Sequence, residues 1–343
     1  MSEEALVYVE RNELRELFKT KLVNAGLPDY LADKTADLMI FADERGIHSH
    51  GSVRTQYYAE RIAKKGLNLD PQFNFEQTGP STGTYFGDNT VGHYVAYEAM
   101  EKAITLAEDS GIGMVGVKEI GHSGAIGYFA EQAAKRGMVA LTVCQSDPMV
   151  VPFGGTEPYF GTNPIAFAAP RENGEPILFD MATTVQAWGK ILDARSKNKS
   201  IPDTWAVDKN GEPTTDPFEV GALLPVAGPK GYGLMMMIDI LSGSLLGLPF
   251  GKHVTSMYED LSEYRRLGQF HIVINPAFFG DKDQFLKQVS EMVEELHAIK
   301  PAKGFDQVYY PGEIQEEVKA QYKESGIPVA QSIYDYLQSD DIY

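Results

Sequence analysis

Apolar residues recur at helical spacing through the first part of the chain. Leu14, Phe18 and Leu22 are four residues apart, which places them on one face of a helix. Pro28 is suited to open a second helix, because its ring presets the backbone of a first turn. A third helix is predicted over 53–65 and ends before a glycine. The first 70 residues therefore predict a helical region.

The pattern changes after Pro71, where short apolar runs bounded by turn residues alternate with helical segments. Such runs predict strands, and their uneven spacing favours a mixed sheet with helices over a regular parallel winding. The predicted strands lie at 73–78, 84–87, 112–117, 138–143, 164–169, 177–179 and 270–274, and the predicted helices at 94–109, 125–135, 185–195 and 284–299.

Both ends of the chain have helical patterns, so we expect them to share one domain around a middle sheet. The prediction is an α+β (mixed α/β) fold with a non-Rossmann mixed sheet. Residues 1–70 with roughly 300–343 form the helical domain, and residues 71–299 form the mixed-sheet domain.

The net charge argues against two classes of partner. The chain has 343 residues, 43% of them apolar, and a formal net charge of −18 at pH 7. Such a surplus repels phosphate backbones and anionic membrane surfaces, so we expect neither nucleic acid nor a membrane as partner. An anionic substrate would need local positive charge, for which the candidates are Arg54, Lys190, Arg195 and Lys230.

Cys144 is the lone cysteine, so no disulfide forms within the chain and a zinc site built on several cysteines is excluded. This usage is typical of the reducing cytoplasm, and the acidic start over 1–4 has no features of a signal peptide. The most apolar stretch, 234–250, is interrupted by Asp239 and is too short for a membrane span. We expect it to form a buried helix and its exit loop.

The letters G-x-G-x-x-G at 111–116 match a dinucleotide-binding fingerprint. In that fingerprint the glycines follow a strand and open a helix, whose N-terminus faces the pyrophosphate. Here the predicted helix precedes the glycines and the predicted strand follows them. We therefore interpret Gly111 as a helix C-cap and reject the fingerprint.

Two histidine segments carry the candidate chemistry. Histidine exchanges a proton near neutral pH, and arginine holds a carboxylate with two parallel hydrogen bonds. If the third helix begins near His50, then His50, Arg54 and Tyr58 form a row on one helix face. His122 lies between glycines after a predicted strand and before a predicted helix, where ligands approach closely. An alternative is a metal site made of His48, His50 and His122, and purely structural histidines are another.

Polar loops follow several predicted strands. Ser146 and Asp147 come after 138–143, and Asp180 follows 177–179. Ser146 is a candidate to hydrogen-bond a cofactor, Asp147 to orient a histidine, and Lys230, at a helix start, to meet a phosphate or carboxylate. Each loop alone is a plain turn, but their number at element ends favours a large ligand.

Taken together, these segments resemble the malate/L-lactate dehydrogenase family that lacks the Rossmann fingerprint. The resemblance covers nearly the whole chain and is carried by Ala42 to Gly51, Gly121 to Ile126, Cys144 to Gly155, Phe179 to Lys190, Gly228 to Gly233 and Pro311 to Glu313.

The resemblance implies a nicotinamide-dependent dehydrogenase, usually a homodimer, with NAD as cofactor and NADP possible. It places the substrate pocket in the helical domain and the cofactor in the mixed-sheet domain, without a metal. His122 and His50 match the proton-transfer positions, and which of the two accepts the proton stays open. His50, Arg54 and Tyr58 match the substrate pocket. The positions that match cofactor contacts are Ser146, Asp180, Met181, Ala182, Lys230, Gly312, Glu313 and Ile314.

Within the family, the segments are most similar to the members that oxidise (S)-ureidoglycolate to oxalurate, a step in the use of allantoin and purine nitrogen. That reaction is the expected one. The alternative is another 2-hydroxy acid, of the malate, lactate or diketogulonate type. A metal-dependent hydrolase and a non-enzymatic binding module are the alternatives outside the class.

Overall fold

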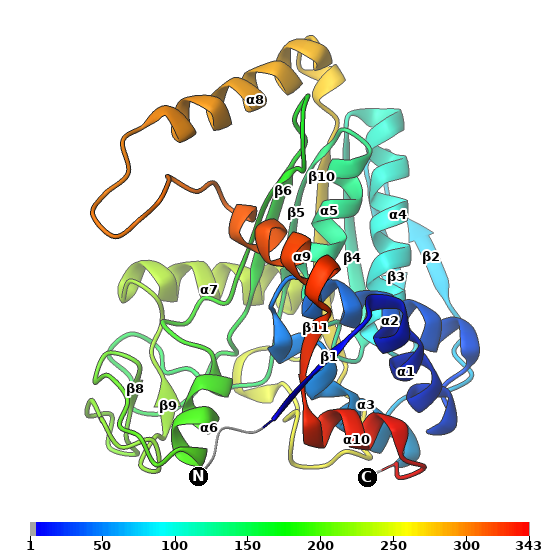
Figure 1. Ribbon diagram of the computed structural model, residues 1–343. Coiled ribbons are helices and arrows are strands. Elements are labelled where there is room, and N and C mark those ends of the chain that lie inside the picture. Colours follow the sequence, from blue (N-terminus) through cyan, green and yellow to red (C-terminus); the bar gives the residue numbers. More distant parts are fainter. Residues whose placement is uncertain (1–4, 343) are drawn as a thin grey trace.

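The computed structural model describes residues 5–342, and a mixed sheet runs through the middle of the molecule (Figure 1). Within that range the sheet has seven strands in the order β2-β3-β4-β10-β5-β6-β7. Adjacent strands pair antiparallel, except that β3 and β4 pair parallel. The strands are β2 (Asn74–Gln77), β3 (Thr82–Phe86), β4 (Ile112–Ile120), β5 (Val139–Cys144), β6 (Ile165–Ala169), β7 (Ile177–Met181) and β10 (Leu267–Ile274). The predicted mixed α+β fold is confirmed.

The strand β10 lies at the centre although it comes late in the chain. Its side chains alternate between the two faces of the sheet, and both faces are covered. Val273 belongs to the core beneath α4 (Gly92–Ser110) and α5 (Gly127–Lys135), while Phe270 packs with Ile238 of α7 (Pro229–Ser242) on the opposite face. Because both faces are buried, the two polar side chains of this strand need partners: Gln269 pairs with Ser123 and His271 with Thr142.

The two chain ends meet in a second core. Strand β1 (Leu6–Val9) pairs antiparallel with β11 (Ile327–Ala330), and the two lie side by side in Figure 1. Around them pack α1 (Arg11–Asn24), α2 (Asp29–Asp43), α3 (Thr55–Ala63) and α10 (Gln331–Gln338). Neither strand is predicted from the sequence, because each has four residues and its partner lies more than 300 residues away. The exact division into two domains stays a prediction.

The remaining elements connect and flank these two cores. They are α6 (Trp188–Ser196), β8 (Ala206–Val207), β9 (Ala222–Leu223), α8 (Lys282–Ala298) and α9 (Glu313–Ser325), with the 3₁₀ turns η1 (His48–His50), η2 (Ser52–Arg54), η3 (Ser244–Leu246), η4 (Gly251–His253) and η5 (Pro276–Phe278). None of the helices within 5–342 has the length and apolar character needed to cross a membrane. The acidic start, Met1 to Glu4, lies outside the described residues.

The rejection of the glycine fingerprint is confirmed. Helix α4 ends at Ser110, Gly111 is its left-handed C-cap with φ of 82°, and β4 begins at Ile112. The chain therefore runs from helix to strand at this point, and no helix N-terminus faces a ligand there.

The expectation that the Met-rich helix is buried is wrong. Only one side of α7 is buried: Ile238 packs against the sheet, and Met235 packs into the cluster around α6, β8 and β9. Met237 and Ile240 on the other side are 41% and 50% exposed. A helix that covers a sheet buries one stripe, and the apolar residues on its outer side remain uncovered in a single chain.

Candidate active site

Two short turns between α2 and α3 position His50, Arg54 and Tyr58. The helix predicted over 53–65 forms as α3, over Thr55–Ala63. It does not extend back to His50, because η1 and η2 are separate turns. Buried Asp43 stabilises these turns by accepting hydrogen bonds from Ser52 N at 2.6 Å and from His48 Nδ1 at 2.9 Å. A Cβ atom at Gly51 would lie 2.1 Å from the Asp43 Cγ, so the turn requires glycine there.

The two turns and the loop after β4 bring together three predicted residues, His50, Tyr58 and His122. His122 follows β4, and its Nδ1 lies 2.7 Å from the Tyr58 hydroxyl oxygen. The His50 ring stacks beside the His122 ring, with 5.7 Å between centroids and 21° between planes. The imidazole pair and the phenol therefore form one cluster, built from η1, α3 and the loop after β4.

Arg54 lies at the edge of this cluster. Its Nε donates to the Ser49 carbonyl at 2.8 Å, and its Nη1 donates to the Tyr258 hydroxyl at 3.0 Å. Tyr258 was not predicted, because nothing in its local sequence sets it apart from a loop tyrosine. The guanidinium is half-buried and remains placed to meet a carboxylate.

Asp147 has a different partner from the expected one. Its Oδ1 accepts from Arg265 Nη2 at 3.0 Å and its Oδ2 accepts from Met257 N at 3.1 Å. The expectation that it orients a histidine is therefore wrong. Asp147 instead holds both ends of the loop over 257–265, which carries Tyr258. A buried carboxylate must be paired, and these two donors pair it.

Sequence reasoning also missed His93, in the first turn of α4. It is fully buried, and its ring meets the Tyr58 ring edge-on at 5.1 Å and 89°. Neither of its ring nitrogens has a hydrogen-bond partner among the described residues. No local pattern distinguishes it from a core histidine, and only the fold places it beside Tyr58.

The surroundings keep these rings uncharged near neutral pH. Loss of water, with a smaller effect of Arg54, lowers the pKa of His50 to about 4. Loss of water and the neighbouring His50, Arg54, His93 and Arg265 lower the pKa of His122 well below its ordinary value. Burial raises the pKa of Tyr58. Neutral imidazoles are the forms that can accept a proton.

His48 does not join this cluster. Its Nδ1 pairs with Asp43, and its ring lies 6.1 Å from that of Tyr322. Across residues 5–342, no three His, Cys, Asp or Glu side chains are grouped so as to hold a metal ion.

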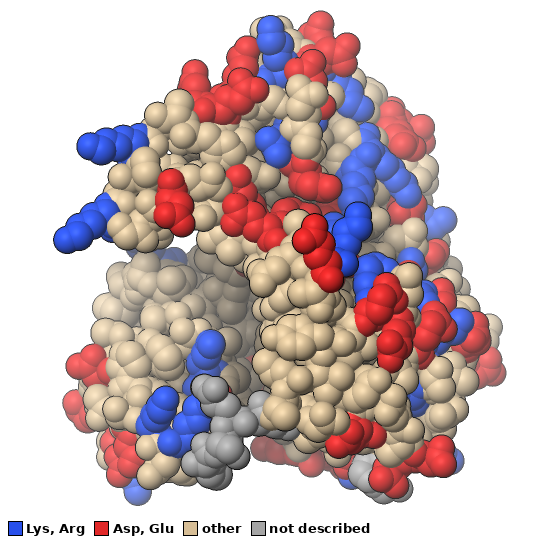
Figure 2. Space-filling view, in the orientation of Figure 1, with Lys and Arg blue, Asp and Glu red and all other residues tan. Residues whose placement is uncertain are grey.

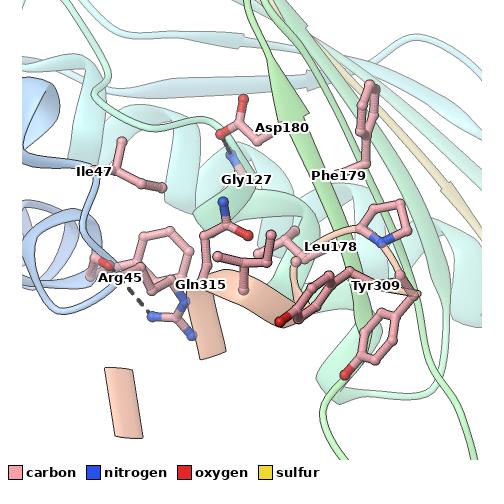
Figure 3. A pocket seen from close by; sticks show the side chains of 13 residues that line it. Arg45, Ile47, Gly127, Leu178, Phe179, Asp180, Tyr309 and Gln315 are labelled. Atoms are coloured by element: carbon pink, nitrogen blue, oxygen red, sulfur yellow. Dashed lines mark hydrogen bonds between the residues drawn. The ribbon is translucent and has the colours of Figure 1, made fainter. Parts of the chain in front are cut away.

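A pocket of about 370 Å³ opens at the start of α5, five residues after His122 (Figure 3). The Asp180 carboxylate lies at one end, where its Oδ2 accepts from Gly127 N at 2.7 Å, and the Tyr309 ring lies at the other. Loss of water raises the pKa of Asp180 to about 6, although the Gly127 N–H acts in the opposite direction. Two further predicted cofactor residues, Gly312 and Ile314, also line it.

The pocket has the features of a nucleotide site. Phe41, Leu178 and Tyr309 form apolar walls suited to a base, and the Asp180 oxygens can accept hydrogen bonds from ribose hydroxyls. Gly312 has φ of 95°, and a Cβ there would lie 2.7 Å from the Leu178 carbonyl oxygen. Glycine therefore lets α9 approach the sheet closely.

The helix α9, which begins beside Gly312, is held by a buried ion cluster. Arg45 is 3% exposed and contacts Glu44 at 2.6 Å, Glu131 at 2.8 Å and Glu316 at 2.9 Å. These carboxylates come from the end of α2, from α5 and from α9. Arg45 itself lines the pocket, so the cluster joins three elements around it.

The remaining predicted cofactor residues lie elsewhere. Met181 and Ala182 directly follow Asp180. Ser146 and Lys230 are not among the residues that line the pocket: the Ser146 hydroxyl accepts from Thr162 N at 2.8 Å, and Lys230 is exposed in the first turn of α7. Asn163 joins these two regions, because it contacts Ser146 N and the Met235 carbonyl.

Comparison with known proteins places the chain among dehydrogenases. The family model for malate/L-lactate dehydrogenase matches residues 9–338. The chain is 58% identical over 335 residues to a ureidoglycolate dehydrogenase (NAD(+)) of Escherichia coli O157:H7, covering 98% of this chain and 96% of that protein. It is 38% identical to a malate dehydrogenase of Pyrococcus abyssi, covering 98% of this chain and 94% of that one.

The solved structure of a sulfolactate dehydrogenase from Methanocaldococcus jannaschii superimposes with a TM-score of 0.90 at 36% identity, covering 97% of this chain and 96% of that chain. The match in sequence and the match in fold agree over almost the full length. The chain belongs to the malate/L-lactate dehydrogenase family.

Proposed function

We propose that this protein oxidises (S)-ureidoglycolate to oxalurate with NAD as hydride acceptor. One observation carries the class of reaction: neutral His122 and His50 lie beside Tyr58 and Arg54, next to a pocket shaped for a nucleotide. The substrate follows from the 58% identity to an enzyme named for ureidoglycolate. The proposal places the reaction in purine nitrogen use.

In this proposal Arg54 holds the substrate carboxylate. The guanidinium would exchange its present acceptor, the Tyr258 hydroxyl, for a carboxylate oxygen, which makes the stronger, charge-assisted hydrogen bond. His122 takes up a proton when the substrate hydroxyl loses its own, and His50, stacked beside it, forms the pocket wall.

The cofactor residues divide into two groups. Asp180, Gly312 and Ile314 line the pocket beneath α9 and would hold one part of NAD there, together with their chain neighbours Met181, Ala182 and Glu313. Ser146 and Lys230 would contact another part near the start of α7. When bound, NAD supplies the ring that accepts hydride, and the protein supplies position and proton transfer.

A side-by-side steady-state assay with NAD tests the substrate. We expect kcat/KM for (S)-ureidoglycolate to exceed that for malate and lactate by roughly 10⁴, because a site built for a polar group leaves its own polar atoms unpaired with analogues that lack it. Equal efficiency on malate or lactate would reduce the claim to a general 2-hydroxy acid dehydrogenase.

We further propose a homodimer in the cytoplasm. The outer side of α7 exposes Met236, Met237 and Ile240, with Leu245 and Phe250 nearby, and such a patch is typical of subunit interfaces. Figure 2 shows a recess between this region and the segment after α8, with few charged groups on its walls. Buried Cys144, the lone cysteine, supports a reducing compartment.

Light scattering during size exclusion tests the assembly. The wild-type protein should elute with twice the mass of one chain, and Ile240→Glu should shift the mass toward one chain, because a buried charge without a partner opposes association. The matched control is Val23→Glu, an exposed apolar position on α1, which lies across the molecule from α7 in Figure 1. A wild-type mass of one chain would contradict the dimer.

A further inference from the structure

The nitrogen of His122 that carries the lone pair can be identified from its neighbours. The Gly124 N–H donates to His122 Nδ1 at 3.3 Å. A backbone amide can only donate, so Nδ1 must be the acceptor nitrogen, and Nε2 carries the hydrogen of the neutral ring. The Tyr58 hydroxyl lies 2.7 Å from the same Nδ1 and therefore donates to it as well.

The basic nitrogen of His122, Nδ1, thus already accepts a hydrogen bond from the Tyr58 hydroxyl. A neutral imidazole has one basic nitrogen, so a substrate hydroxyl that reached Nε2 would meet a hydrogen rather than a lone pair. The oxygen of Tyr58 still has lone pairs to offer. The shortest chemical route to Nδ1 is therefore through the Tyr58 hydroxyl.

We propose that Tyr58 is a catalytic residue that relays the substrate proton to His122. The inference rests on the proposed dehydrogenase function and specifies its proton path. The carbinol C–H bond breaks and its electron pair leaves as hydride for the nicotinamide. The substrate O–H bond breaks, and its electrons complete the C=O bond while its proton moves to the Tyr58 oxygen. The phenolic proton moves to His122 Nδ1, so Tyr58 ends neutral and His122 ends as an imidazolium.

The packing around Tyr58 suits a relay. The side chain is 3% exposed, and burial raises the pKa of the phenol, so it stays protonated and can pass a proton on without becoming a phenolate. The His93 ring meets the phenol edge-on at 5.1 Å, and Tyr57 meets it at 5.3 Å. These rings leave the phenol little freedom to turn away from His122.

The first test needs no turnover. Long-range ¹H–¹⁵N correlation spectra of the labelled protein without cofactor, assigned with a His122→Asn variant, report which nitrogen of His122 is protonated. We expect Nε2–H, and we expect the Nδ1 resonance to shift in Tyr58→Phe, which loses one of its two donors. The Nδ1–H form would overturn the proposal, because the phenol would then face a hydrogen.

The second test is a proton inventory, in which kcat is measured in mixtures of H₂O and D₂O. If two protons move in the rate-limiting step, kcat of the wild type plotted against the fraction of D₂O gives a curve. Tyr58→Phe should give a straight plot, with kcat lower by roughly 10²–10⁴ and KM little changed. The control is Tyr57→Phe, the neighbour on α3 whose hydroxyl accepts from Arg61 Nε. It should keep the curvature and the wild-type kcat.

The outcomes separate the relay from the function. A wild type that oxidises ureidoglycolate with a straight plot, or a Tyr58→Phe variant that keeps kcat, overturns the relay alone. A wild type active only on malate or lactate corrects the proposed substrate, and the inventory is then measured on that acid. A wild type inactive on all three acids overturns the proposed function and, with it, the relay, although the spectra still report the tautomer.

Discussion

At the scale of single residues, His122 is the group on which the proposed reaction depends most. We expect His122→Ala to lower kcat by roughly 10²–10⁴, because the released proton loses its acceptor. The dissociation constant of NADH should stay the same, since the pocket beneath α9 is not lined by His122.

Stopped-flow turnover and fluorescence titration with NADH measure these two quantities. The control is His253→Asn, an exposed histidine of η4, which should behave like the wild type. If His122→Ala turns over near the wild-type rate, the proton acceptor is another group, and His50 becomes the candidate.

Arg54 is the second residue with a specific prediction. We expect Arg54→Lys to raise KM for the substrate about tenfold or more although the charge is kept, because lysine lacks the planar pair of donors that matches a carboxylate. Steady-state kinetics of Arg54→Lys and Arg54→Ala provide the check. A lysine variant equal to the wild type beside a defective alanine variant would show that charge alone matters.

At the scale of elements, the ion cluster of Arg45 determines how α9 sits over the cofactor pocket. Glu316→Gln removes the carboxylate that α9 contributes to Arg45. We expect the dissociation constant of NADH to rise about fivefold, equivalent to about 1 kcal/mol for a partly exposed pair. Fluorescence titration measures it.

Glu317→Gln is the matched control for this prediction. Glu317 is the next residue of α9, is exposed, and only accepts from Gln307 Nε2 at 3.2 Å. It should leave NADH affinity unchanged. If both variants bind NADH as tightly as the wild type, the cluster holds α9 for stability alone and has no influence on the pocket.

At the scale of the whole molecule, several neutral histidines make stability depend on pH. Burial lowers the pKa of His93 and His271 to about 3 and that of His50 to about 4, and lowers that of His122 as well. In the unfolded chain these groups titrate near the ordinary value of about 6.5. The unfolded chain therefore binds more protons as the pH falls, and the free energy of unfolding decreases.

We expect this loss to begin near pH 6.5 and to continue as the pH falls toward the folded pKa values of about 4 and about 3, by up to about 1.4 kcal/mol per pH unit for each histidine. Asp180, whose pKa burial raises to about 6, acts in the opposite direction, as do Asp239 and Glu98, whose pKa values burial also raises, but these three groups face four histidines. Urea unfolding at several pH values measures the slope. His93→Phe should reduce it by about one proton, and an unchanged slope in this variant would contradict the assignment.

The order of elements could be predicted from the chain alone, because helix and strand periodicity are local properties. The central helices and strands, the helix-to-strand order around Gly111 and the two histidine segments all depend on neighbours within a few residues. The mixed sheet followed from the uneven spacing of those elements. The cofactor and the chemical class came from the resemblance to a family, which could be found because the motifs that carry it are continuous in sequence.

Contacts between distant segments were decided only by the tertiary structure. The pairing of β1 with β11, the partner of Asp147 and the approach of Tyr258 to Arg54 join residues more than 100 positions apart. Asp43 keeps α3 from extending back to His50, because its buried carboxylate takes the backbone N–H of Ser52. His93 resembles any core histidine in sequence and becomes a neighbour of Tyr58 only through packing. A local pattern determines which element forms, whereas the burial of polar groups, which must find partners wherever the chain folds back, determines what meets in the site.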